Sequence, residues 1–166
     1  LLVHEDGSYE LSSFELTNHF DNNLVRIEKF NPKRIYSLIH QDGKTKNYFI
    51  KRFLLEDLAF GRRVSLINET PDSKMILISA ASNPLVKIDI TKGKSNIEES
   101  IEQNLAELID VKGMRAQGNR LSLHDVHRVE LLTEEEDELE MEEEKEEDKA
   151  GEKLGPEESE TAVEKS

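Results

Sequence analysis

The chain has 166 residues, enough for one domain of ordinary size, and a formal net charge of −14. It has no cysteine, which excludes disulfides and thiolate metal or redox sites and suits a cytoplasmic protein. There is no signal-peptide pattern and no apolar run approaching the ~18 residues of a membrane-spanning helix, so neither a secreted nor a membrane class is indicated.

The charge is distributed unevenly along the chain. From Thr133 onward there are 17 acidic and 4 basic residues, whereas residues 1–132 hold 19 acidic and 18 basic ones. Like charges at this density repel and leave little to bury, so we predict a folded domain over 1–132 and a disordered acidic tail over 133–166. The tail is either a solubilising segment or a regulatory one. Because the chain begins at Leu1, within a strand-like run, we expect it to be the C-terminal piece of a longer protein.

The folded part repeats itself. The runs "LVHEDG" at 2–7 and "LIHQDG" at 38–43 lie 36 residues apart, and "LISAASN" at 77–83 is a weaker third copy 39 residues further on. Each run reads as a short strand entering a turn with Asp-Gly or Ser-Asn, residues that favour tight hairpins. Repeats of about 36–39 residues predict an all-β fold, a propeller or related circular array. The alternative is an ordinary β-sandwich containing two similar hairpins.

Other stretches are also typical of strands. The segment from 84 to 91 alternates, with Val86, Ile88 and Ile90 on one face. His4 and His40 occupy equivalent repeat positions, which indicates a shared packing role. Further strands are predicted at 23–30, 34–39, 62–68 and 74–79, and in the runs that follow the first two turns.

One segment predicts a short helix, from about 96 to 107. Ile97, Ile101, Leu105 and Leu108 follow one another at helical spacings. Ser95 with an acid three residues later fits a capping box. We expect this helix to pack on the sheet in a structural role.

Catalytic motifs are absent from the sequence. It contains no Gly-x-Ser-x-Gly elbow and no phosphate-binding Gly-x-x-x-x-Gly-Lys loop. His124 and His127 would meet on one helical turn and could bind a metal with Asp125 nearby, but a single His-x-x-His is more typical of a surface pair. We therefore predict no catalytic residue, cofactor site or metal site in this segment.

Lysines and arginines gather at turns and strand edges. Lys44 and Lys46 lie two apart beyond a hairpin turn, so an extended chain would point both to one face. Basic residues so placed would neutralise DNA phosphates without reading base sequence, and nearby glycines would let a backbone approach closely. The alternative is a solvated charged surface. The candidate phosphate-binding residues are Lys44, Lys46, Lys51, Arg52, Arg62, Arg63, Lys112, Arg115 and Arg120.

The run "VKGMRAQGNR" at 111–120 carries a resemblance. It fits throughout the pattern Val-Lys-Gly-x-Lys/Arg-Ala-x-Gly-Asn/Lys-Arg, and "NYFIKRFLLED" at 47–57 is similar as well. Both resemble the C-terminal domain of the A subunit of bacterial type II topoisomerases, particularly the topoisomerase IV-like A subunits of the Bacteroidetes kind. The likeness extends over most of residues 1–128.

The resemblance implies a β-pinwheel of four-stranded blades that carries double-stranded DNA on a basic rim, bends it and presents the transported segment. The matching positions Lys51, Arg52, Lys112, Arg115 and Arg120 would then contact phosphates, and the other candidates follow by placement. The cleavage tyrosine of the family lies in an upstream domain, and Mg²⁺ and ATP act elsewhere in the holoenzyme. That holoenzyme pairs an A-subunit homodimer with an ATPase B subunit, in the cytoplasm at the nucleoid.

Two departures from the family pattern are visible. The Gln-Arg-Arg-Gly-Gly-x-Gly box of DNA gyrase is missing, and "FGRRVS" at 60–65 shares only a fragment of it, which favours a topoisomerase IV-like enzyme over a gyrase-type one. Residues 1–132 also make only three to four repeats, so either further blades lie upstream or the domain is open. A functional alternative is a protein-interaction propeller whose acidic tail docks a basic partner.

Overall fold

The computed structural model describes residues 1–13, 22–57 and 60–133, and Leu1–Thr133 form one compact unit. The predicted acidic tail lies outside the described residues, apart from Thr133. Leu85 N donates to Thr133 Oγ1 at 2.8 Å, so Thr133 is still part of the folded unit. The described elements are β1 (Leu2–His4), β2 (Ser8–Glu10), β3 (Leu24–Ile27), β4 (Ile35–Gln41), β5 (Tyr48–Leu54), β6 (Val64–Ser65), β7 (Lys74–Ser79), β8 (Leu85–Lys92), β9 (Ile97–Asn104), α1 (Leu105–Leu108), β10 (Asn119–Arg120) and β11 (Asp125–Leu131).

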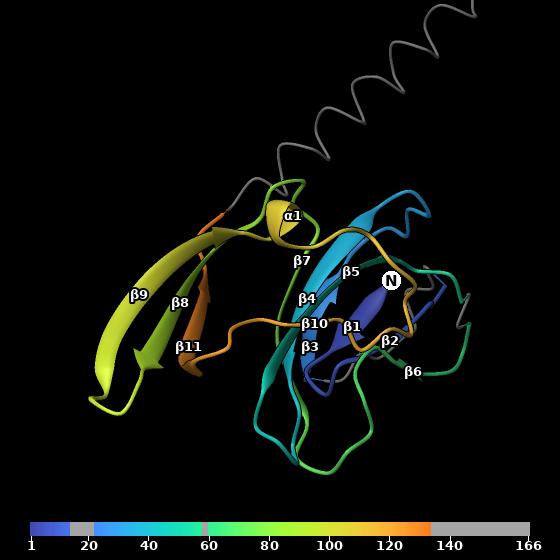
Figure 1. The fold of residues 1–166 in the computed structure, drawn as a ribbon. Helices are drawn as coiled ribbons and strands as arrows, with labels where there is room; N and C mark the ends of the chain where they lie inside the picture. The colour runs from blue at the N-terminus through green and yellow to red at the C-terminus, as the bar shows by residue number, and fades with distance from the viewer. Residues whose placement is uncertain (14–21, 58–59, 134–166) are drawn as a thin grey trace, which may run out of the picture. The chain divides into compact units, whose positions relative to one another are not determined.

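These strands form three antiparallel sheets, which confirms the predicted all-β class (Figure 1). The first sheet has the order β3-β1-β2-β6, the middle sheet β10-β5-β4-β7 and the third sheet β11-β8-β9. Each contains a hairpin of consecutive strands whose first strand is flanked by a later one, with β3 beside β1, β7 beside β4 and β11 beside β8. On the other side, β6 joins β2 and β10 joins β5, although each lies in the chain beyond the hairpin of the next sheet. The first two sheets are therefore each completed by a strand from the following repeat.

The middle sheet is buried on both faces. Its residues Tyr36, Leu38 and Phe53 pack in one core with the first sheet, whereas Ile39 and Ile50 pack in a second core with the third sheet. A strand with apolar neighbours on both sides has no polar face, which is why β4 reads as a nearly continuous buried run rather than an alternating one. The repeats are held together mainly by these two hydrophobic cores, one on each face of the middle sheet.

His4 and His40 confirm their predicted packing role. Both are buried at equivalent positions of β1 and β4. His4 Nε2 lies 3.2 Å from Glu10 Oε1, and His40 Nε2 lies 2.9 Å from the carbonyl oxygen of Gln117.

The third repeat is not where the sequence pattern placed it. The copy at 77–83 spans the end of β7 and the connection to β8, and these two strands belong to different sheets. β7 pairs with β4, whereas β8 pairs with β9 in the true third hairpin, which turns at Gly93 and Asn96. The prediction of a hairpin at 77–83 was wrong because a turn signal does not reveal which strands pair across it.

The predicted helix at 96–107 is also wrong, because most of it is the strand β9. Spacings of four, as between Ile97 and Ile101, keep residues on one face of a strand as well as of a helix. Pairing decides between the two, since all eight residues of β9 are in register with β8 and Ile101 lies opposite Ile88. Lys92 Nζ also reaches Glu99 Oε2 at 2.5 Å across the hairpin. Only the four-residue α1 remains helical, with Asn104 Oδ1 accepting from Ala106 N at 2.9 Å.

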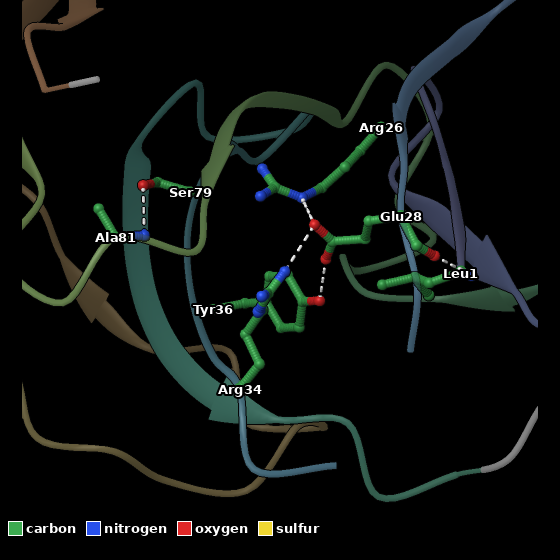
Figure 2. A network of polar contacts seen from close by, with 7 residues as sticks. All are labelled: Leu1, Arg26, Glu28, Arg34, Tyr36, Ser79 and Ala81. Atoms are coloured by element: carbon green, nitrogen blue, oxygen red, sulfur yellow. Dashed lines mark hydrogen bonds and ion pairs between the residues drawn. The ribbon is translucent and has the colours of Figure 1, made fainter. Parts of the chain in front are cut away.

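A buried carboxylate joins the end of β3 to the start of β4 (Figure 2). Glu28 accepts hydrogen bonds from Arg26 Nε at 2.8 Å, from Arg34 Nη1 at 2.9 Å and from the Tyr36 hydroxyl. Burial, together with the neighbouring Glu28 carboxylate, raises the pKa of Tyr36, so this phenol stays protonated and remains a donor.

Replacing Glu28 by alanine is expected to lower the free energy of unfolding by about 3 kcal/mol, because two largely buried guanidinium groups lose their shared carboxylate. Chemical denaturation measures this loss. The exposed Glu56→Ala is the control and should stay within about 0.5 kcal/mol of the parent. Equal effects of the two substitutions would contradict a structural role for the network.

Candidate nucleic-acid interface

A groove of about 610 Å³ lies beside the middle sheet and collects several of the predicted basic residues. His40 and Lys51 come from the sheet itself. The rest of the lining comes from residues 62–69 and 114–117. The first of these ranges includes β6, an exchanged strand, that is, a strand of one repeat that completes the sheet of the repeat before it. We call this groove the basic groove. It brings together Lys51, Arg62, Arg63 and Arg115, which are up to 64 residues apart in the chain.

Local structure explains how the arginines reach the groove. Arg62 and Arg63 immediately precede β6, whose pairing with β2 fixes the direction of the chain. Arg115 follows Met114, a residue only 2% exposed that is anchored in the core shared by the first two sheets. The buried methionine holds its loop against the sheet, and the next side chain turns outward.

The three arginines are exposed and held by carboxylates. Asp57 binds Arg62 through both oxygens, at 2.8 and 3.0 Å, and lies 3.7 Å from Arg115 Nη2. Arg63 Nη1 lies 3.8 Å from Asp6 Oδ2. Exposed pairs of this kind contribute at most about 1 kcal/mol each, so a phosphate can replace or join the carboxylate at little cost. The carboxylates therefore hold the guanidinium groups in position, and a phosphate can still bind them.

Sequence reasoning missed Asp57 as the residue that positions two of these arginines. The Tyr9 hydroxyl donates to the Asp57 carbonyl oxygen at 2.6 Å, which ties this residue to the first sheet. Tyr9 and Asp57 are 48 residues apart, and no local pattern reveals that contact.

Lys51 lines the groove but is almost fully buried, at 4% exposure. Its Nζ donates to the Met114 carbonyl oxygen at 2.8 Å and lies 5.1 Å from the centre of the Phe53 ring. Burial lowers the pKa of Lys51 to about 8. The ammonium group is thus engaged within the protein, and this burial argues against the phosphate contact predicted for it.

Lys51 also predicts how stability depends on pH. The unfolded chain holds this proton up to about pH 10.5 and the folded chain only to about pH 8. Stability should therefore rise between pH 8 and 10.5, by about 3 kcal/mol in total from this group. In Lys51→Met that increment should disappear, as measured by denaturation across the window, whereas the exposed Lys33→Met should keep it. A pH profile unchanged by Lys51→Met would contradict the assignment.

Arg52 points to the opposite face of the same strand and does not line the basic groove. Its Nε donates to Ser37 Oγ at 3.1 Å and its Nη1 to the Ala106 carbonyl oxygen at 3.5 Å. At 8% exposure, with its donors used internally, Arg52 braces the second core. As for Lys51, this burial argues against the phosphate contact predicted for Arg52.

The remaining candidates are exposed and lie outside the basic groove. Lys44 and Lys46 sit in the loop between β4 and β5, where Lys46 has a φ of 62°. The chain is not extended there, so the argument that both point to one face was wrong. Lys46 and Arg120 line a smaller cavity of about 230 Å³, and Lys112 lies just ahead of the loop that carries Arg115.

The His124–His127 pair does not lie on a helical turn. His127 is within β11 and contacts Thr91 Oγ1 through Nε2, and His124 precedes the strand. Within residues 1–13, 22–57 and 60–133, no cluster of three or more potential metal ligands is present.

Comparison with known proteins identifies the family. Residues 1–134 match the model of the topoisomerase C-terminal domain of Bacteroidota. The chain belongs to this family. The resemblance to the C-terminal domain of a bacterial topoisomerase A subunit is thereby confirmed. Searches of curated proteins and of solved structures found no match to this topoisomerase domain. In its described part, no helix is long and apolar enough to cross a membrane.

Proposed function

We propose that this topoisomerase C-terminal domain binds double-stranded DNA through its phosphate backbone. The observation that carries the proposal is the convergence of Arg62, Arg63 and Arg115 on the basic groove. Arginine presents planar, paired donors that suit phosphate oxygens. Exposed Lys44, Lys46, Lys112 and Arg120 extend the proposed contact surface. Backbone contacts of this kind bind without reading bases and let DNA be bent or guided.

Within the holoenzyme, the bound DNA is the transported segment, presented for ATP-dependent strand passage. The active-site tyrosine, Mg²⁺ and ATP act in other parts of an A-subunit homodimer and its B-subunit partner, in the cytoplasm at the nucleoid. The absence of the gyrase box favours a topoisomerase IV-like enzyme over a gyrase-type one.

The proposal is tested by titrating a labelled duplex with the 166-residue chain at several salt concentrations. The logarithm of the binding constant should fall linearly with the logarithm of salt concentration, with a slope of about 0.9 per phosphate neutralised. Failure to bind duplex at about 50 mM salt, a concentration at which phosphate contacts are strong, both with and without residues 134–166, would instead favour the protein-interaction module.

The acidic tail gives a second prediction. Residues 134–166 carry 17 acidic and 4 basic residues, and would compete with phosphates for the same cations at a high effective concentration. Removing them should tighten DNA binding several-fold at low salt, with the difference shrinking as salt screens the charges. A Gly/Ser tail of equal length is the control and should behave like the deletion. Unchanged affinity in both would leave the tail as a solubilising segment.

A further inference from the structure

Lys51 is a buried amine that forms no ion pair with a carboxylate in the part of the chain that the structure describes. Burial lowers the pKa of Lys51 to about 8. About a quarter of this amine is therefore neutral at pH 7.5, compared with about one part in a thousand for an ordinary lysine. A neutral amine is a nucleophile, so Lys51 can react under conditions in which exposed lysines are almost wholly protonated.

The hydrogen bond from Lys51 Nζ to the Met114 carbonyl oxygen, at 2.8 Å, leaves the reactive electron pair free. A neutral amine has two N–H groups and one lone pair, and the carbonyl oxygen accepts only an N–H. The same bond can persist after acylation, because an amide nitrogen keeps one N–H. This contact therefore orients Nζ without blocking it.

His40 supplies a free proton acceptor on the same face of the middle sheet. Lys51 lies opposite Leu38, and His40 is two residues further along β4, so His40 and Lys51 are diagonal neighbours. His40 Nε2 lies 2.9 Å from the Gln117 carbonyl oxygen, which can only accept, so the ring proton is on Nε2. Burial lowers the pKa of His40 and keeps the ring neutral. Within the described chain its buried Nδ1 has no hydrogen-bond partner and is available to take a proton.

The basic groove joins this amine to a site for an anion. Arg62, Arg63 and Arg115 line it together with Lys51, and their exposed guanidinium groups suit phosphate oxygens. The volume of about 610 Å³ is typical of sites for small organic ligands. The titratable and charged groups that line the groove are His40, Lys51, Arg62, Arg63, Glu69 and Arg115. A phosphate held by the arginines would bring an attached carbonyl group into the groove that contains the amine.

We propose that Lys51 is a modification site for small acyl phosphates, compounds that carry a phosphate on an activated carbonyl group. The arginines bind the phosphate, and the Nζ lone pair attacks the carbonyl carbon. A C–N bond forms, the C–O bond to phosphate breaks, and inorganic phosphate leaves with the electron pair. Nζ loses one proton to His40 Nδ1, and a stable amide remains. The proposal goes beyond DNA binding and does not depend on it.

The test incubates the 166-residue chain with acetyl phosphate and follows acetylation of each lysine by peptide mass spectrometry. At pH 7.5, Lys51 should be acetylated about tenfold faster than the exposed Lys33, because far more of its amine is neutral. The rate at Lys51 should level off above about pH 8, whereas the rate at Lys33 should keep rising toward pH 10.5.

A second reagent separates phosphate binding from amine reactivity. When Arg62, Arg63 and Arg115 are together replaced by alanine, acetyl phosphate should acetylate Lys51 several-fold more slowly. N-acetoxysuccinimide, an acylating ester without a phosphate, should still acetylate Lys51 at the parent rate. That rate also shows that the environment of Lys51 is intact in the variant.

The matched control is the triple alanine variant of Lys29, Lys33 and Arg128, three exposed residues outside the groove. It has the same net charge as the arginine variant and should keep the parent rate of Lys51 acetylation by acetyl phosphate. Two results would overturn the proposal. The first is acetylation of Lys51 no faster than that of Lys33 at pH 7.5. The second is an equal rate at Lys51 in the two triple variants, since the groove would then not hold the phosphate.

Discussion

Replacing Arg62, Arg63 and Arg115 together by alanine is expected to lower the affinity for duplex DNA by roughly a hundredfold near 0.1 M salt. Each arginine lines the basic groove and is at least 38% exposed, so each can neutralise a phosphate. Losing three such contacts should reduce the slope of log affinity against log salt by about 2.7. Fluorescence anisotropy over a salt series measures both quantities.

The matched control removes the same charge from other places. Lys29, Lys33 and Arg128 are exposed and lie outside the groove, so their triple alanine variant has the same net charge. It should retain most of the affinity and of the salt slope. Equal losses in the two variants would show that only net charge matters. A loss that differs strongly between duplex sequences would instead indicate base readout.

Substituting Gly118 by alanine is expected to destabilise the fold by about 3 kcal/mol or more. At a φ of 90°, a Cβ on this residue would lie 2.1 Å from the Ile50 carbonyl oxygen, so β10 could not stay paired with β5. Denaturation measures the loss, and hydrogen exchange at Phe49 and Ile50 locates it.

Two other glycines calibrate this substitution. Gly113 lies in the same loop, has no positive φ and has open space where a methyl group would be added, so Gly113→Ala should be nearly neutral. Gly61 has a φ of 69° but nothing within 4 Å, so Gly61→Ala should cost about 1 kcal/mol from backbone strain alone. The expected order of destabilisation is Gly118, then Gly61, then Gly113. A different order would contradict the close approach at Gly118.

The sequence predicted well wherever local chemistry decides the structure. The Asp-Gly turn after His4 and the alternation of Val86, Ile88 and Ile90 each correspond to the predicted strand or turn. Sequence-based prediction failed where the structure depends on which strands pair with one another. The spacing of Ile97 and Ile101 suits both a helix and a strand, and only the pairing with β8 resolves it.

The candidate site divides in the same way. Arg62, Arg63 and Arg115 were predicted from their positive charge and their positions at turns. They reach one groove only because β6 pairs with β2 and because Met114 is buried. The burial of Lys51 and Arg52 was not predicted, because charged residues are usually exposed. Their place within the apolar run "YFIKRFL" was the available signal, since a strand buried on both faces buries its charged residues too.

The exchanged strands also set an order of assembly. Ile50 meets its partner Asn119 only after 69 further residues have been made, so the middle sheet stays incomplete until the third hairpin has left the ribosome. Contacts this distant in sequence slow folding. The exchanged strands also link the repeats, because separating one repeat from the next would remove a strand from the sheet of its neighbour. In solenoids, where each repeat packs only on the next, the ends can fray. Here we expect Leu1–Thr133 to unfold as a single cooperative unit.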